Sequence, residues 1–209
     1  MLKPDFANTF TAAMDCRGNY LGPALARNLP LEGSRRLLDI AGGSGIFACA
    51  IVAQHPHLQA TVFERPPVDR IARTLIAERG YADRVAVAAG NMFRDSLPGG
   101  FDVHLYSNVL HDWDFPEVQA LLATSFRALE PGGLVVIHDA HLHADKTGPL
   151  PVAKYSALLM NVTEGKCYSL GEMDTLLLGA GFQDLHFTPT VADRSVITAR
   201  KPRAGGHEG

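Results

Sequence analysis

Short, almost continuously apolar runs alternate with segments of helical periodicity along most of the chain. The runs at residues 37–40, 103–106 and 134–138 are typical of parallel strands that are covered on both faces. Five strands are expected, at residues 36–40, 60–64, 85–88, 102–107 and 134–139. Helical patterns connect them at residues 45–54, 68–79 and 117–129. This alternation predicts an α/β fold with a doubly wound sheet.

Further elements are expected on both sides of this α/β core. After it, the pattern predicts helices at residues 152–161 and 169–179, then strands at residues 183–187 and 195–199 that can pair as an antiparallel hairpin. Before it, apolar residues at helical spacing indicate a helical segment: Phe6, Phe10, Met14, Tyr20, Leu21, Leu25 and Leu29. We therefore divide the chain into a helical linker at residues 1–33, an α/β domain at residues 34–201 and a flexible tail at residues 202–209.

The helix predicted at residues 117–129 has both a start signal and a stop signal. Asp114 can cap its N-terminus, with Pro116 in the first turn and Glu117 at the spacing of a capping box. A Pro-Gly-Gly sequence at residues 131–133 ends the helix before the next strand. Asp112 is expected to have only a local role in the same loop.

Composition and charge exclude several classes of protein. The 209 residues carry 19 Lys and Arg against 22 Asp and Glu, so no basic surplus indicates nucleic acid or an anionic membrane as a partner. The cysteines (Cys16, Cys49 and Cys167) are odd in number and lack a C-x-x-C spacing, which predicts neither a disulfide framework nor a zinc site. The sequence Lys-Pro-Asp at residues 3–5 interrupts any signal sequence, and no apolar stretch has membrane-spanning length. We expect a cytoplasmic protein.

A glycine-rich loop directly follows the first predicted strand. Residues 41–45 read Ala-Gly-Gly-Ser-Gly and lead into a helix whose free N–H groups and positive dipole end suit a ligand. Glu64 ends the second predicted strand, 19 residues after Gly45, where a carboxylate can accept hydrogen bonds from both hydroxyls of a ribose. The pattern indicates a nucleoside cofactor at the carboxyl ends of the first two strands.

Two nucleoside cofactors fit this loop. The spacing Gly43-x-Gly45-x-x-Ala48 satisfies the dinucleotide fingerprint, which makes an NAD-dependent oxidoreductase one candidate. Asp39 would repel a pyrophosphate, however, and no tyrosine is followed by a lysine four residues later. S-adenosylmethionine (SAM) carries a sulfonium and an ammonium group, so it suits the carboxylate of Asp39 better. SAM is preferred, and NAD stays open.

Histidines near the end of the fifth predicted strand have the composition of a metal site. The group consists of His138, Asp139, His141 and His143. Because side chains alternate along a strand, residues 138 and 139 should point to opposite faces of the sheet. We therefore expect no metal.

Six motifs follow one another in the order found in a known enzyme family. They are LLDIAGGSG at residues 37–45, GNMF at 90–93, SNVLHDW at 107–113, LEPGG at 129–133, NVTEGK at 161–166 and LGAGF at 178–182. Over residues 6–200 they resemble the SAM-dependent O-methyltransferases of the plant caffeate/isoflavone type and the hydroxyindole (acetylserotonin) O-methyltransferases. The resemblance implies a Rossmann-like class I methyltransferase fold, with seven strands and an antiparallel last strand. It also makes residues 34–201 the SAM-binding catalytic domain.

The resemblance implies roles for individual residues. Those implied to bind SAM are Asp39, Ala41, Gly43, Gly45, Glu64, Asn91, Met92 and Ser107. His111 is implied to be the general base and Asp139 the acid that orients it. Imidazole suits this role, because a phenol with a pKa of about 10 must lose its proton near neutral pH. The residues expected to contact the acceptor are Trp113, Met160, Asn161 and Cys167.

Three residues depart from the family pattern. Ala41 replaces the first glycine of the loop, which the loop tolerates if Ala41 keeps a negative φ angle. Asn91 replaces an aspartate and can still offer an acceptor to the adenine amino group. Cys167 stands where many members carry a second acid beside the histidine, so support of His111 would rest more on Asp139.

We predict a SAM-dependent O-methyltransferase of secondary metabolism that acts on a hydroxyl of a small aromatic or polyketide-like acceptor. Two further hypotheses stay open: a SAM-binding relative that performs hydroxylation or decarboxylation, and a non-catalytic SAM-binding remnant. Family members usually carry an N-terminal helical domain that forms an intertwined dimer, and this chain starts close to the catalytic domain. The expected polypeptide partners are a second copy of the chain or a separate N-terminal domain.

Overall fold

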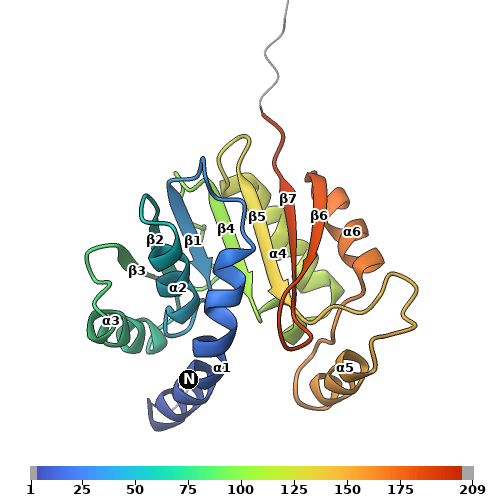
Figure 1. Cartoon of the computed structure of the whole chain (residues 1–209), viewed down its shortest axis with the longest axis horizontal. Helices are drawn as coiled ribbons and strands as arrows, with labels where there is room; N and C mark the ends of the chain where they lie inside the picture. The colour runs from blue at the N-terminus through green and yellow to red at the C-terminus, as the bar shows by residue number, and fades with distance from the viewer. Residues whose placement is uncertain (1–3, 204–209) are drawn as a thin grey trace, which may run out of the picture.

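One mixed sheet of seven strands organises the molecule (Figure 1). The computed structural model describes residues 4–203, without the side chains of residues 4–8 and of residue 10. The strands are β1 (Arg36–Ile40), β2 (Gln59–Glu64), β3 (Val85–Ala89), β4 (Val103–Ser107), β5 (Leu134–Asp139), β6 (Gln183–Pro189) and β7 (Ser195–Arg200). Their order is β3-β2-β1-β4-β5-β7-β6, and β7 runs antiparallel to both of its neighbours. The predicted sheet of seven strands with an antiparallel last strand is confirmed.

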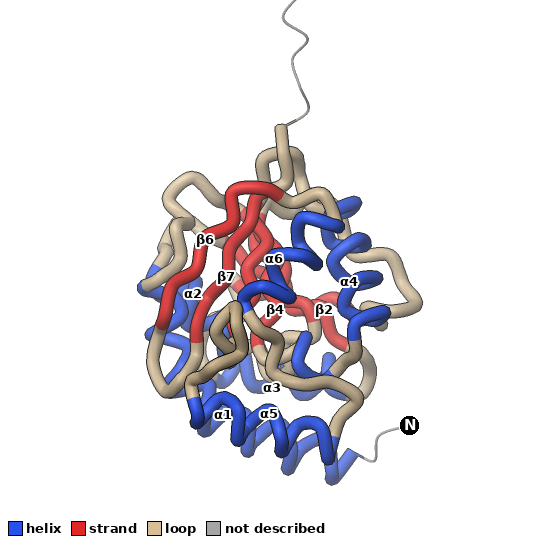
Figure 2. The backbone as a smooth tube through the Cα atoms, turned by 90° about the vertical axis from the view of Figure 1, so that its right-hand side faces the viewer, coloured by secondary structure: helices blue, strands red, loops and turns tan. Residues whose placement is uncertain are grey.

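Helices cover both faces of this sheet (Figures 1 and 2). They are α1 (Pro4–Arg27), α2 (Ile46–Gln54), α3 (Val68–Glu78), the 3-10 turn η1 (Leu110–Asp112), α4 (Phe115–Ala128), α5 (Leu150–Val162) and α6 (Leu170–Gly179). Helices α1, α2 and α3 contribute to the apolar cluster on one face, and α4 and α6 to the cluster on the other. Among the described residues, no helix combines the length and the apolar character that a membrane crossing requires.

Burial of the central strands explains why their sequences read as apolar runs. All six residues of β5 are buried, as are four of the five residues of both β1 and β4. A parallel strand with helices on both faces has no solvent-facing side, so its side chains do not alternate between apolar and polar. The polar exceptions in these strands include Asp39, His104, His138 and Asp139. Three of these lie at or near the carboxyl ends of strands, where open α/β sheets bind ligands.

The carboxyl-terminal half of α1 is part of the core. Leu21 and Leu25 are buried, and a Cβ atom on Gly18 would lie 2.4 Å from the side chain of Ile46 in α2. Tyr20, in contrast, is 65% exposed. The side chains of Phe6 and Phe10 and most of the tail predicted at 202–209 lie outside the described residues. Within residues 11–27, α1 therefore packs onto the domain rather than extending away from it.

The capping box occurs at a different helix from the one predicted. Asp114 does cap α4, but it accepts from the N–H of Phe115, and no reciprocal bond from Glu117 joins it within the described residues. The complete box is formed by Ser169 and Glu172 at the start of α6. The same Ser-x-x-Glu spacing is present in the sequence, so this box could have been predicted.

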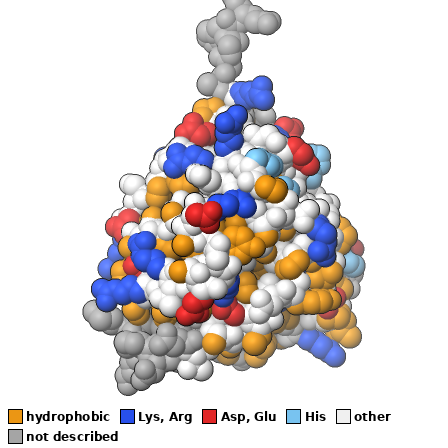
Figure 3. Space-filling model, turned by 60° about the vertical axis from the view of Figure 1, so that its left-hand side comes forward, with side chains coloured by type: hydrophobic (Ala, Val, Ile, Leu, Met, Phe, Trp, Pro, Cys, Tyr) orange, Lys and Arg blue, Asp and Glu red, His pale blue; other side chains and the backbone are white. Residues whose placement is uncertain are grey.

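The surface carries no large field of a single charge on the face shown in Figure 3. Lys and Arg side chains are interspersed there with Asp and Glu side chains. This distribution agrees with the net charge of −3 and gives no electrostatic footprint for a polyanion on that face.

Candidate active site

The carboxyl ends of β4 and β5 place a histidine beside a carboxylate. The turn η1 follows β4 and directs His111 toward Asp139, the last residue of β5. Nδ1 of His111 lies 2.5 Å from Oδ1 of Asp139, which also accepts the backbone N–H of Ala140 at 2.8 Å. Both side chains are buried, with 5% and 4% of their surface exposed. The structure thus brings together the two residues that the sequence assigned to one pair.

Each member of this pair shifts the pKa of the other. Burial by itself would raise the pKa of Asp139, but the charge and the hydrogen bond of His111 outweigh it and lower that pKa to about 2. Burial likewise favours neutral His111, yet the Asp139 carboxylate outweighs it and raises the pKa of the imidazole. A carboxylate that stays ionised holds the proton of the ring on Nδ1 and leaves Nε2 as the basic nitrogen.

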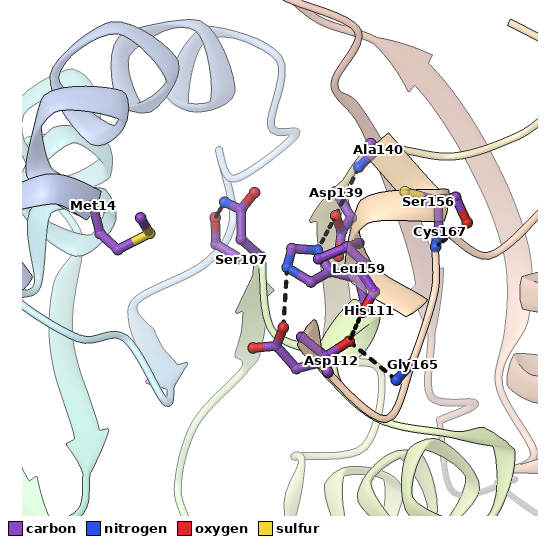
Figure 4. A network of polar contacts seen from close by, with 12 residues as sticks. Met14, Ser107, His111, Asp112, Asp139, Ala140, Ser156, Leu159, Gly165 and Cys167 are labelled. Carbon is purple, nitrogen blue, oxygen red and sulfur yellow. Dashed lines mark hydrogen bonds and ion pairs between the residues drawn. The ribbon is translucent and has the colours of Figure 1, made fainter. Parts of the chain in front are cut away.

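Asp112 has more than the local role expected for it. Its Oδ1 lies 3.5 Å from Nε2 of His111, so Asp112 and Asp139 flank the ring on opposite sides (Figure 4). The ring of Tyr155, from α5, meets the imidazole edge to face, with centroids 5.7 Å apart. The loop at residues 163–166 supports this turn closely, because a Cβ atom on Gly165 would lie 2.4 Å from the carbonyl oxygen of His111. Asp112 directly follows His111 in the sequence. A prediction of the short 3-10 turn over these residues would have indicated that its carboxylate lies near the imidazole.

A second histidine lies on the other side of β5. Nδ1 of His138 lies 2.8 Å from Oγ of Ser107, and the side-chain amide of Asn108 donates to the same Ser107 oxygen at 3.3 Å. Burial lowers the pKa of His138 to about 3, so this ring is neutral. Residues 138 and 139 therefore point to opposite faces of the sheet, as strand alternation requires. Among the described residues, no group of three or more potential metal ligands lies close together.

The glycine loop between β1 and α2 makes a tight left-handed turn. Gly43 and Gly45 have φ angles of +57° and +74°, and a Cβ atom on Gly45 would lie 2.8 Å from Ile76. Ala41 has a φ angle of +54°, so the expectation of a negative angle at this position is wrong. The N–H of Ala41 donates to the carbonyl oxygen of Phe63 at 2.8 Å, which continues the β1–β2 ladder into the turn. This conformation costs an L-residue about 1–2 kcal/mol, which the surrounding hydrogen bonds offset.

Two carboxylates lie at this loop in different environments. Asp39 is fully buried beneath it, where a Cβ atom on Gly42 would lie 2.4 Å from Oδ2 of Asp39. Neither oxygen of Asp39 has a hydrogen-bond partner in the described part of the chain, and burial, together with the nearby charge of Glu64, raises its pKa to about 7. Glu64 accepts the N–H of Gly43 at 3.1 Å and that of Arg65 at 2.8 Å. Burial raises the pKa of Glu64, against these two hydrogen bonds.

The two residues assigned to adenine follow β3 directly. Oδ1 of Asn91 accepts the N–H of Phe93 at 2.9 Å, and the backbone N–H of Asn91 donates to Asp95 at 2.8 Å. The Asn91 side chain therefore already closes a turn, which leaves its NH₂ group and one lone pair of Oδ1 for other contacts. Met92 packs against the apolar cluster that contains Phe63 and Leu97.

The residues expected at the acceptor side are only partly brought together. Trp113 is half-buried beside η1, and its carbonyl oxygen accepts from the Tyr168 hydroxyl at 2.7 Å. Cys167 is fully buried, and its N–H donates to Oγ of Ser156 at 3.0 Å. Met160 and Asn161 lie on the exposed face of α5, and their contact with the acceptor stays a prediction. The helical period turns their neighbour Leu159 inward instead, at 5% exposure, with Met160 at 66%.

Helix α1 contributes polar contacts that the sequence did not reveal. Asp15 pairs at 2.5 Å with Arg79, the residue that follows α3, and accepts a hydrogen bond from the hydroxyl of Ser44 in the glycine loop. Arg17 donates to Oδ1 of Asn108 at 3.1 Å, as does Arg194 from the turn between β6 and β7 at 3.3 Å. These contacts join residues far apart in the chain, so no local spacing could have indicated them.

Comparison with known proteins identifies the family. The model of the O-methyltransferase domain matches residues 2–183. This chain belongs to the O-methyltransferase domain family. It is 37% identical over 161 residues to 3-hydroxy-5-methyl-1-naphthoate 3-O-methyltransferase of Streptomyces sahachiroi, a match that covers 77% of this chain and 47% of that protein.

Solved structures extend the likeness to almost the whole domain. An O-methyltransferase family 2 protein from Planctomyces limnophilus, in complex with apigenin, is 39% identical and superposes with a TM-score of 0.90, covering 96% of this chain and 62% of that one. Human N-acetylserotonin methyltransferase in complex with SAM is 28% identical with a TM-score of 0.89, covering 96% and 57%. The O-methyltransferase domain described here spans about half the length of the curated relatives it matches.

Proposed function

We propose that this O-methyltransferase domain binds SAM and transfers its methyl group to a hydroxyl of a small aromatic or polyketide-like acceptor, with His111 as the general base. The observation that carries the proposal is the buried contact between Nδ1 of His111 and Asp139 at the carboxyl edge of the sheet. This contact orients a basic Nε2 at the edge where doubly wound sheets bind their ligands. Relatives named for a hydroxynaphthoate and for acetylserotonin support an aromatic acceptor.

The residues at the glycine loop fit SAM. The buried, unpartnered carboxylate of Asp39 favours a positively charged group nearby, and the open side of Gly43 leaves space above the loop. Glu64 ends β2 beside that glycine, where its carboxylate would hold the ribose hydroxyls. Asn91 and Met92 would hold the adenine, and Ser107 would lie toward the methionine part. SAM supplies an electrophilic methyl group when it is bound.

The sheet topology separates this proposal from the NAD hypothesis. The dinucleotide-binding fold has a parallel sheet of strand order 3-2-1-4-5-6. Here β7 is inserted antiparallel between β5 and β6. The match to the O-methyltransferase domain agrees with this difference.

The chain's own residues provide a route for the acceptor proton. Asp139 keeps the ring proton on Nδ1, so Nε2 can accept the proton of an acceptor hydroxyl placed against it. The resulting imidazolium is stabilised by Asp139 on one side and Asp112 on the other. The ring of Tyr155 packs against the imidazole and shields that side from water, which strengthens these charge interactions.

We also propose that a second copy of the chain covers the exposed face of α5. Four apolar side chains on this helix are largely exposed: Leu150, Leu158, Met160 and Val162. Grouped apolar exposure of this kind marks interaction surfaces.

Calorimetric titration and a methyl-transfer assay test the proposed function together. We expect the chain to bind SAM and S-adenosylhomocysteine but not NADH, and to add one methyl mass to an acceptor from a panel of phenols. Glu64→Ala should weaken SAM binding because it removes charge-assisted ribose hydrogen bonds. His111→Ala should keep SAM affinity within a few-fold and lower methylation by about 100-fold or more.

The matched control is Glu78→Ala, which removes an exposed carboxylate from α3. It should change neither the affinity for SAM nor the rate of methylation. Equal methylation by His111→Ala and the wild-type chain would end the assignment of the base. SAM binding without transfer to any phenol would favour a binding role instead, and a product mass other than that of methylation would indicate a different reaction.

A further inference from the structure

Two arginines from distant parts of the chain converge next to His111. Arg17 of α1 and Arg194 of the β6–β7 turn both donate to Oδ1 of Asn108, at 3.1 and 3.3 Å. Both guanidinium groups also lie over the ring of Tyr155, at 5.8 and 4.7 Å from its centroid. The same ring contacts the imidazole of His111. Both cations are half-buried at the place where the acceptor would meet the base.

Neither cation has an anionic partner in the described part of the chain. No carboxylate there forms an ion pair with Arg17 or Arg194. Asp112 feels the charge of Arg17 without forming an ion pair with it and lies against Nε2 of His111, while Asp139 is bound to Nδ1 of the same ring. Two like charges brought together away from bulk water repel each other unless they share an anion.

The guanidinium groups also keep unused hydrogen-bonding capacity. Each has five N–H donors in a planar fork that matches a carboxylate. Arg194 uses one donor, on Nε, and Arg17 uses one on Asn108 with a second, 4.0 Å contact to the sulfur of Met14. Asn108 therefore holds the two guanidinium groups side by side but leaves most of their N–H donors without an acceptor among the described residues.

We propose that Arg17 and Arg194 together bind a carboxylate of a ligand in this site. The proposal rests on the proposed function and deepens it, because such a carboxylate can belong to the amino-acid part of the methyl donor or to an aromatic hydroxy acid as acceptor. In either case it anchors the ligand by charge-assisted hydrogen bonds beside His111. The arginines act as binding residues, not as acid or base.

Two ligand pairs that differ by a carboxylate distinguish the sources. For the donor, S-adenosylhomocysteine is compared with its decarboxylated analogue S-adenosyl-3-thiopropylamine, which keeps the amino group. For the acceptor, 3-hydroxy-1-naphthoate is compared with 2-naphthol. Calorimetry measures each Kd for the wild-type chain, Arg17→Gln, Arg194→Gln and the double variant, with Arg73→Gln on the exposed face of α3 as control.

We expect one carboxylate ligand to lose about tenfold or more in affinity with each single variant, while its carboxylate-free counterpart stays within twofold. Arg194→Lys should restore part of the loss, since it restores the charge without the fork. A loss for the homocysteine ligand assigns the donor, and a loss for the naphthoate assigns the acceptor. The inference is overturned if neither carboxylate ligand shows this difference, including the case in which both members of a pair weaken equally. If the wild-type chain binds no S-adenosylhomocysteine at all, it is the proposed function that fails.

Discussion

The buried carboxylate of Asp39 makes the stability of the folded chain depend on pH. Its pKa is raised from 3.8 to about 7 in the folded chain, first by burial and then by the charge of Glu64. Between these two values the folded chain keeps a proton that the unfolded chain has released. The contribution of Asp39 to stability is therefore complete below about pH 4, falls as the pH rises toward 7, and is constant above that.

Asp39→Asn should remove this pH dependence. An amide at this position stays neutral, so the stability of the wild-type chain relative to Asp39→Asn should fall between pH 4 and 7. The fall is at most about 4 kcal/mol, because one pKa unit corresponds to about 1.4 kcal/mol. Urea unfolding at pH 4.5, 6 and 8 measures it, with the exposed Asp83→Asn as control. Parallel stability curves for the wild-type chain and Asp39→Asn would contradict the account.

The sequence could predict the position of a residue where a strand end determines it. Asp139, Asp39 and Glu64 lie at or next to the carboxyl ends of parallel strands and His111 lies in the turn after one, and apolar runs in the sequence locate those ends. The positive φ angle of Ala41 was missed because it depends on a hydrogen bond to the neighbouring strand β2, not on the residue type. A backbone angle of this kind is decided by tertiary context.

Predictions of helices and strands are limited in the same way, because they do not include contacts between distant parts of the chain. Periodicity located the strands and most helices to within a few residues, since each element shows its buried face in the sequence. It did not show which polar residues of α1 reach the sheet edge. Arg17 and Asn108 are 91 residues apart, and Asp15 and Arg79 are 64 apart. Contacts over such separations leave no local pattern, so only the folded chain reveals them.

The contact of α1 with the glycine loop can be measured as a coupling energy. Asp15 joins Arg79 and Ser44, and a guanidinium nitrogen of Arg79 donates to the carbonyl oxygen of Ser44 at 2.8 Å. The ion-paired side chains are only 16% and 22% exposed. Removal of one partner therefore leaves a polar group poorly hydrated inside the network.

A double-mutant cycle of Asp15→Asn and Arg79→Gln should give a coupling of about 1–3 kcal/mol in urea unfolding. The pair Lys146 and Glu172 is the matched control, because its lysine is 54% exposed and such surface pairs contribute about 0–1 kcal/mol. Asp15→Asn should also weaken binding of S-adenosylhomocysteine, since the loop loses a support. Equal coupling in both pairs would show that α1 does not hold the loop through Asp15.

At the scale of the whole molecule, the α5 face is where an assembly would form. Its exposed apolar residues lie on one helix near the carboxyl edge of the sheet, the same edge that carries His111 (Figure 1). A partner there would cover the face and also enclose the acceptor side of the site. Assembly and activity are therefore expected to be coupled.

Leu158→Glu combined with Met160→Glu should abolish self-association of the chain. The two side chains are 57% and 66% exposed, so the change costs the folded monomer little while it places charges in the proposed interface. Sedimentation velocity over a concentration series should show a concentration-dependent sedimentation coefficient for the wild-type chain and a constant monomer value for the variant. Lys154→Glu, also exposed on α5, controls for added negative charge. If the wild-type chain sediments as a monomer throughout, a second copy is not the partner, and a separate helical domain becomes the occupant to test.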